Sequence, residues 1–378
     1  MNGVQSRLGR SRSRRPASIV AAAALVVAGP LAVAAPAQAD GSGYDVVVSG
    51  LDNPRGVAIA ANGRVYVAEA GTGGDALQVP SPEGGSLGVG FSGQVRSYDP
   101  MTGSSSVVLS GLLSAAGEDG TAEGGPAGLA TRGSTVYVIM GGYQQMIPAF
   151  VTGSAADAIR AQLGRLIEVT PSGSHRTIAD VGGFDYDYTG QSGVGVDGNT
   201  EAQDANPYGV LALPGSVLVA DAGSNTITAV RPGSGSSAVL ADVPTSPTGY
   251  LQDAVPTCVA KASSGGFWVG TLDGQVLRWD GHSALQPSDA LSLSGDVPFT
   301  IGGCTSDGNG GLYATDQASF FFGQPGSVVH ISPSGQVTRV LGDLLAPAGV
   351  ALSGDGHSLY VATNSILAGA GQLIRIDV

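Results

Sequence analysis

Apolar and polar residues alternate in short runs along this chain, and glycine-containing turns separate the runs. The clearest pairs of runs lie at residues 51–70, 126–140, 205–221, 256–271, 302–316 and 347–363. Each pair has the tight central turn that is typical of a β-hairpin. Two weaker runs follow the hairpins, as at residues 93–98 and 106–109. The pattern therefore predicts a repeated unit of four antiparallel strands.

The repeat predicts an all-β fold, namely a six-bladed β-propeller with four strands in each blade. The last blade stops at its third strand, residues 372–376. An apolar run at residues 44–48 precedes the first blade. We expect this N-terminal strand to complete the last blade, which closes the ring and leaves no sheet edge unpaired.

Three insertions lengthen the early blades, at residues 71–92, 141–162 and 183–206. Because successive strands alternate in direction, all three emerge on one side of the ring, which we call the loop-rich face. The opposite side, where strand one turns into strand two, is the turn face. Residues 154–163 are expected to form a short helix with Ser154 as its N-cap. Binding residues on a rigid β scaffold commonly lie in such loops.

Residues 1–39 differ from the rest of the chain. Five arginines precede an Ala/Val/Leu-rich run, and Ala37-Gln38-Ala39 has the small-x-small form of a cleavage site. We predict a secretory signal peptide over residues 1–39 and a single propeller domain over residues 40–378. An uncleaved membrane anchor is the alternative, although Gly29-Pro30 would make a weak span. The cleaved protein is expected to be secreted, monomeric and without a membrane span.

Charge narrows the range of partners. Removing residues 1–39 leaves 12 basic against 30 acidic side chains, a formal net charge of −18. A chain this acidic repels nucleic acid and anionic membranes. The expected partners are therefore a small molecule, a glycan or an extracellular protein.

The two cysteines, Cys258 and Cys304, lie on the predicted first strands of blades four and five. In an exported protein they are candidates for a disulfide. Alignment of the repeats places them one position out of register, so two buried thiols are the alternative. Their spacing fits no metal motif.

Carboxylates recur at the position just after the second strand. Glu69, Asp221 and Asp316 occupy it in blades one, three and five, with Asn364 one residue beyond it in blade six. Their oxygens are candidate ligands for a divalent cation such as Ca²⁺ and candidates for acid–base catalysis. The starts of the neighbouring first strands add the candidate ligand-binding residues Arg55, Asn206, Tyr208 and Thr257.

A structural role is the alternative for Asp221. The stretch Asp221-Ala222-Gly223-Ser224-Asn225 is typical of a turn in which Asp and Asn side chains bond nearby backbone N–H groups. Glu69 and Asp316 have no such asparagine neighbour, which makes them the stronger candidates for the channel.

The positions of the histidines and of one aromatic segment bear on catalysis by histidine and on sugar binding. The four histidines lie in outer turns or on a third strand, which argues against Ser-His-Asp, Cys-His and histidine-dependent lyase chemistry at the channel. Asp185-Tyr186-Asp187-Tyr188 offers acids and aromatic rings that suit sugar binding, with packing of its own loop as the alternative.

Several stretches resemble the ScyD/ScyE family of exported propeller proteins. They are residues 51–56, 67–71, 206–215, 219–225 and 253–257. More widely, the chain is similar to NHL-type and gluconolactonase-like propellers. The resemblance implies the fold and export. The chain departs from the family pattern in two places. Residues 71–92 lack the family's cysteine pair, and Thr271 stands where the family commonly has an acid.

Two functions are consistent with these features. The first is non-catalytic binding of a small molecule, glycan or protein partner on the loop-rich face. The second is a metal-dependent hydrolase or lactonase of gluconolactonase-like design. The second would use Glu69, Asp221 and Asp316, with Asn364, around a divalent cation.

Overall fold

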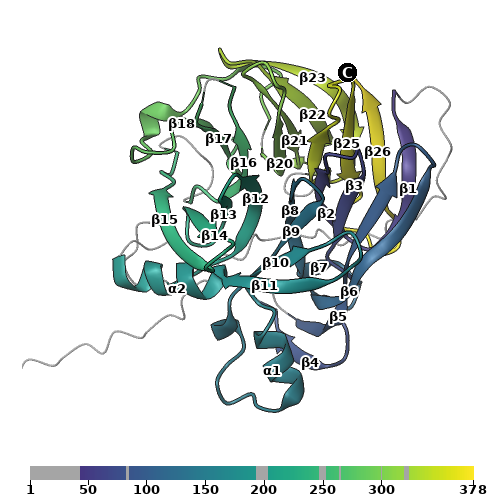
Figure 1. Cartoon of the computed structure of the whole chain (residues 1–378), viewed down its shortest axis with the longest axis vertical. Helices are drawn as coiled ribbons and strands as arrows, with labels where there is room; N and C mark the ends of the chain where they lie inside the picture. The colour runs from purple at the N-terminus through teal and green to yellow at the C-terminus, as the bar shows by residue number, and fades with distance from the viewer. Residues whose placement is uncertain are drawn as a thin grey trace, which may run out of the picture.

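The computed structural model describes residues 43–81, 85–192, 203–246, 253–263, 265–298, 300–318 and 323–378. Six β-sheets surround a central axis, and each sheet is one blade, as Figure 1 shows. The predicted six-bladed β-propeller is therefore confirmed. The predicted signal peptide over residues 1–39 lies outside the described residues.

The strands follow one another outward from the axis in most blades. Blade one contains β2 (Pro54–Ile59), β3 (Val65–Glu69), β5 (Ser86–Asp99), β6 (Ser104–Ala116) and β7 (Ala122–Gly124), with β4 (Leu77–Pro80) beside β5. Blade two contains β8 (Pro126–Arg132), β9 (Thr135–Met140), β10 (Arg165–Val169) and β11 (His175–Asp180). Blade three contains β12 (Pro207–Leu213), β13 (Ser216–Asp221), β14 (Thr226–Arg231) and β15 (Ser236–Asp242).

The second half of the ring is less regular. Blade four contains β16 (Pro256–Lys261), β17 (Phe267–Thr271) and β18 (Val276–Trp279). Blade five contains β20 (Gly303–Ser306), β21 (Leu312–Asp316), β22 (Gly326–Ile331), β23 (Gln336–Leu344) and β19 (Ser294–Gly295). Blade six contains β24 (Val350–Leu352), β25 (Ser358–Thr363), β26 (Gly371–Asp377) and β1 (Asp45–Leu51).

The N-terminal strand closes the ring. β1 pairs antiparallel with β26, with Asp45 opposite Arg375 and Val46 opposite Ile374. The two strands come from opposite ends of the described chain and together complete blade six, as Figure 1 shows. The outer edge of this blade is thus built from the run that the sequence pattern assigned to it.

Blade four departs from the predicted four strands. Its described residues form three strands, and only an isolated bridge between Leu277 and Ala290 stands where a fourth would lie. Pro287, which has no backbone N–H to give to a ladder, begins the short helix η2 (Pro287–Asp289) here. The chain then pairs with blade five through β19, which runs parallel to β23.

The loop-rich face carries an extension of blade one and a short helix. β5 and β6 run past the body of the blade, and α1 (Ser154–Arg160) packs against them through Ala156 and Ile159. Figure 1 shows α1 and β4 projecting together from the ring. The predicted helix is confirmed, but its predicted cap is wrong. Gly153 occupies the N-cap position, and no side chain bonds the first turn.

A second helix, α2 (Val181–Ser192), occupies part of the insertion predicted as a loop at residues 183–206. Its first turn is held by Asp180, whose Oδ1 accepts a hydrogen bond from the backbone N of Gly183 at 2.9 Å. An aspartate at this position satisfies N–H groups that have no partner within the helix. The helix contacts β14 and β15 of blade three, as Figure 1 shows.

Candidate functional site

Glycines bring the first strands close together around the axis. Pro-x-Gly begins three first strands, at residues 54–56, 126–128 and 207–209, and directly precedes a fourth, at residues 347–349. A Cβ atom on Gly209 would lie 2.6 Å from the carbonyl oxygen of Thr257, and one on Gly349 would lie 2.5 Å from that of Arg55. The central cavity that remains has a volume of about 60 Å³. That space holds a few water molecules rather than a sugar or lactone ring.

A disulfide forms part of the cavity wall. Cys258 and Cys304 are bonded, and their Cα atoms lie 5.8 Å apart. Cys258 stands where blades one, two, three and six carry the glycine of Pro-x-Gly. Of the two alternatives open for the cysteines, the structure has the disulfide, which joins the first strands of blades four and five.

Glu69 is fully buried, and both of its oxygens have partners. Oε1 accepts hydrogen bonds from Arg96 Nε at 2.8 Å and Gln94 Nε2 at 2.9 Å, and Oε2 accepts one from the backbone N of Asp52 at 3.0 Å. Arg96 therefore neutralises the charge. Glu69 holds the end of β3, the start of blade one and strand β5 together.

Asp316 has a comparable role in blade five. Its Oδ1 accepts hydrogen bonds from the backbone N of Thr300 at 3.1 Å, the hydroxyl of Thr300 at 2.9 Å and the backbone N of Ala318 at 3.1 Å. The side chain is 5% exposed. Like Glu69, this carboxylate ties the end of a second strand to the segment that leads into the first strand of the same blade.

Asp221 makes the hydrogen bonds expected of a turn-closing residue, and both Asp221 and Asn225 also bond to the backbone of other segments. Oδ1 of Asp221 accepts hydrogen bonds from the backbone N of Gly223 at 3.0 Å, Ser224 at 2.9 Å and Asn206 at 2.6 Å. Asn225 adopts a left-handed conformation, with φ of 56°, and its Oδ1 accepts from the backbone N of Val255 at 2.8 Å. The motif thus links blade three to the segment that enters blade four.

A second buried carboxylate lies against Asp221. Asp185 of α2 is fully buried, and its Oδ1 accepts a hydrogen bond from the hydroxyl of Thr228 at 2.7 Å. The Oδ2 atoms of Asp185 and Asp221 have no donor on any other described residue. Burial first, and then the charge of Asp221, raise the pKa of Asp185 well above its usual value. A protonated Asp185 can donate its own hydrogen to Asp221, which is how two adjacent acids remain buried.

A third buried acid, Asp204, lies in the same region. Burial raises the pKa of Asp204 to about 7, and the charges of Asp221 and Asp253 act in the same direction. Its neighbour Tyr143 stacks on Tyr186 of α2 with ring centroids 4.5 Å apart. No Lys, Arg or His of the described residues forms an ion pair with these acids. We call Asp185, Asp204 and Asp221 the acid cluster.

The remaining predicted residues are dispersed. Arg55 and Tyr208 line the central cavity, and Arg55 Nη2 donates a hydrogen bond to the carbonyl oxygen of Ala122 at 2.8 Å. Oδ1 of Asn206 accepts from the backbone N of Gly142 at 3.3 Å. Asn364 closes its own loop through a bond from Nδ2 to the carbonyl oxygen of Ala370 at 3.1 Å. Thr257 also lies in the core of the ring, bonded to main-chain oxygens of β17 and Ile301.

The three predicted carboxylate ligands do not form a shared metal centre. Within the described residues, no group of three or more His, Cys, Asp or Glu side chains is arranged to hold a metal ion. Glu69, Asp221 and Asp316 each bond within their own blade, so the ring position that they share does not bring their oxygens together. A cation held jointly by these three side chains does not fit this arrangement.

Sequence reasoning missed the acid cluster. The sequence predicts Asp185, Tyr186 and Tyr188 as a candidate sugar site, but Tyr186 stacks on Tyr143, and the hydroxyl of Tyr188 donates to Asp242 at 3.0 Å. Asp204 carried no motif. The available signal was the density of aspartates between residues 180 and 204, with no lysine or arginine among them.

Comparison with known proteins establishes the class of fold. The chain is similar in structure to a gluconolactonase from Xanthomonas campestris, with 9% identity over 89% of each chain and a TM-score of 0.53. It is also similar to regucalcin, a calcium-binding protein from Agrobacterium tumefaciens, with 13% identity over 89% of this chain and 94% of the other and a TM-score of 0.51. The chain therefore shares the six-bladed propeller fold of these proteins.

Sequence comparison adds no finer assignment. No protein-family model and no curated protein matches the chain. Among the helices that the structure describes, none has the length and apolar character needed to cross a membrane.

Proposed function

We propose that this protein is an exported binding protein of the ScyD/ScyE type, which binds a small molecule, glycan or extracellular protein on its loop-rich face without catalysis. One observation carries the proposal. The ring carboxylates are buried in bonds within their own blades, whereas the central cavity is lined by Arg55 and Tyr208 and by no acidic side chain. The cavity itself is too small for a sugar ring, so a ligand would rest at its mouth, beside the cation of Arg55 and the ring of Tyr208.

The insertions on the same face support a binding role. Phe150, in the segment that leads to α1, is 84% exposed, and Met146 is 44% exposed. A partner that covered these two side chains would remove their apolar surface from water, which favours binding.

The proposal is tested by thermal unfolding of the protein in the presence of small carboxylic acids, whose charge suits the Arg55 guanidinium. A ligand that binds the folded state raises the melting temperature. Arg55→Gln should abolish the rise, while Arg132→Gln, which lies on the turn face, should keep it. A rise that persists in Arg55→Gln would place the ligand elsewhere.

A metal-dependent lactonase is the second candidate. The structural similarity to a gluconolactonase and to the calcium-binding regucalcin favours it. Calorimetric titration with Ca²⁺ or Mn²⁺ and a hydrolysis assay with a sugar lactone separate the two candidates. The binding proposal expects neither signal. Lactone hydrolysis that requires the metal and is lost in Glu69→Gln would replace it.

A further inference from the structure

A polar cavity of about 410 Å³ opens on the turn face, at the seam between blades one and two. Its walls come from the turn between β2 and β3, from the outer strands β5 and β6, and from the turn between β10 and β11. Small-molecule sites are commonly about 300–1,000 Å³ in volume. This cavity is separate from the central channel and lies on the side opposite the loop-rich face.

The packing of the two blades leaves the space open. Gly173 of the β10–β11 turn, with φ of 83°, approaches β6 so closely that an added Cβ would lie 2.6 Å from the carbonyl oxygen of Val108. Below this contact the lining side chains are short, because Ser97, Ser106 and Ser172 stand there. Serines do not fill the gap between the two sheets, and they present hydroxyl groups to it.

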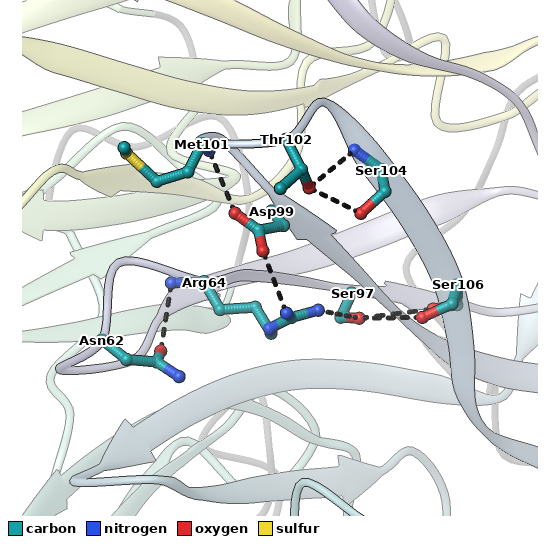
Figure 2. A network of polar contacts seen from close by, with 8 residues as sticks. All are labelled: Asn62, Arg64, Ser97, Asp99, Met101, Thr102, Ser104 and Ser106. Carbon is teal, nitrogen blue, oxygen red and sulfur yellow. Dashed lines mark hydrogen bonds and ion pairs between the residues drawn. The ribbon is translucent and has the colours of Figure 1, made fainter.

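An arginine is fixed at one wall. Figure 2 shows the Arg64 side chain bonded to Asp99 and Ser97, with Nη2 to Oδ2 at 3.1 Å and Nη1 to Oγ at 3.3 Å. Asp99 is held in turn by the backbone N of Met101 at 3.0 Å. A guanidinium group has five N–H donors, so several are free for a ligand. Because Asp99 balances the charge, the wall offers both donors and acceptors without a net charge.

A tyrosine lines the same cavity with its hydroxyl unused. Tyr66 is 1% exposed, and its hydroxyl forms no hydrogen bond with any described residue. Burial raises the pKa of Tyr66, which keeps the hydroxyl protonated and able to donate. The Tyr66 hydroxyl is not among the enclosed polar atoms that lack a partner, so it is open to the cavity and can donate to a ligand there.

We propose that this seam is a binding site for a neutral saccharide unit. Sugar hydroxyls both donate and accept, which matches the paired Arg64 and Asp99 and the free hydroxyl of Tyr66. Val107, Val108 and Pro171 add apolar atoms to the lining, against which the C–H face of a sugar ring can pack. The formal net charge of −13 disfavours an anionic ligand.

The test is calorimetric titration of the protein with a panel of neutral mono- and disaccharides, with sodium sulfate as the anionic comparison. Tyr66→Phe should weaken saccharide binding about fivefold, as expected for one lost hydrogen bond. Its melting temperature should stay unchanged, because the hydroxyl has no protein partner. Tyr137→Phe, at the same position in blade two, is the matched control and should bind normally. Arg64→Lys should weaken binding more strongly, because lysine lacks the planar fork.

Three outcomes would overturn the proposal. The first is no saccharide binding at concentrations of about 10 mM. The second is saccharide binding by Tyr66→Phe and Arg64→Lys that is as tight as in the wild type. The third is sulfate binding that is tighter than the binding of any sugar. Arg55→Gln should leave this site unchanged, so failure here is distinguishable from failure of the binding function proposed for the loop-rich face.

Discussion

Glu69 and Asp221 occupy the same position in two blades, directly after the second strand, yet they lie in opposite electrostatic environments. Both side chains are fully buried. Glu69 faces Arg96 at 2.8 Å, whereas Asp221 lies against a second acid, Asp185. One site is a neutralised ion pair, and the other belongs to a cluster of acids whose pKa values are raised by burial.

The two sites nevertheless share a backbone role. Glu69 accepts a hydrogen bond from the N–H of Asp52, and Asp221 accepts one from the N–H of Asn206. Asp316 does the same with Thr300. In each case the donor precedes the first strand of the same blade. In three of the six blades, therefore, a carboxylate ties the end of strand two to the segment before strand one, while the groups around that carboxylate differ.

The largest effect is expected where the ion pair is broken. Arg96→Met leaves Glu69 buried without a cation, which typically costs about 3–5 kcal/mol of unfolding free energy. Arg176→Met, which removes an exposed partner of Glu168, should cost about 1 kcal/mol or less. Urea unfolding at pH 7 measures both. Equal losses in the two variants would show that Glu69 does not depend on Arg96.

The acid cluster should make stability fall as pH rises. Asp204 has a pKa of about 7 in the folded protein against 3.8 as its ordinary value. Below pH 4 both states hold the proton and nothing is lost. Between about pH 4 and 7 the unfolded chain releases it first, so up to about 4 kcal/mol of stability is lost as pH rises through this window.

Asp204→Asn removes this titration, so the decline in unfolding free energy from pH 4 to pH 8 should be shallower than in the wild type. Denaturant unfolding at each pH measures the two slopes. Identical slopes, or stability that rises with pH over this range in the wild type, would contradict the raised pKa of Asp204.

The strand pattern was predictable because two sequence signals mark each blade. Apolar and polar residues alternate within the strands, and turn residues recur between them. The pairing of β1 with β26 followed from one missing run and one surplus run. Helix α2 was not predictable in this way, because Gly182, Gly183 and Gly190 disfavour a helix. Its stability comes from the cap by Asp180 and from contacts with blade three.

The site was harder to predict for a different reason. Asp185 and Asp221 are 36 positions apart, and only the docking of α2 brings them together. The partners of Glu69 are also distant in sequence, since Arg96 lies 27 positions away on the third strand of the blade. Sequence position identified the ring carboxylates, but it could not show that their oxygens turn into their own blades.

The smallest predicted effect gives the sharpest comparison. Replacing an acid by its amide should raise the free energy of unfolding at Asp185 and lower it at Glu69. In Asp185→Asn the amide still accepts from Thr228 and donates to Asp221 without needing a proton, so stability at pH 8 should rise by about 1 kcal/mol. Glu69→Gln should lower it, because Arg96 loses its counter-charge. Asp187→Asn, on the exposed side of α2, is the control and should change little. If Asp185→Asn destabilised the protein as Glu69→Gln does, the buried acid at Asp185 would have to be charged and held by a cation.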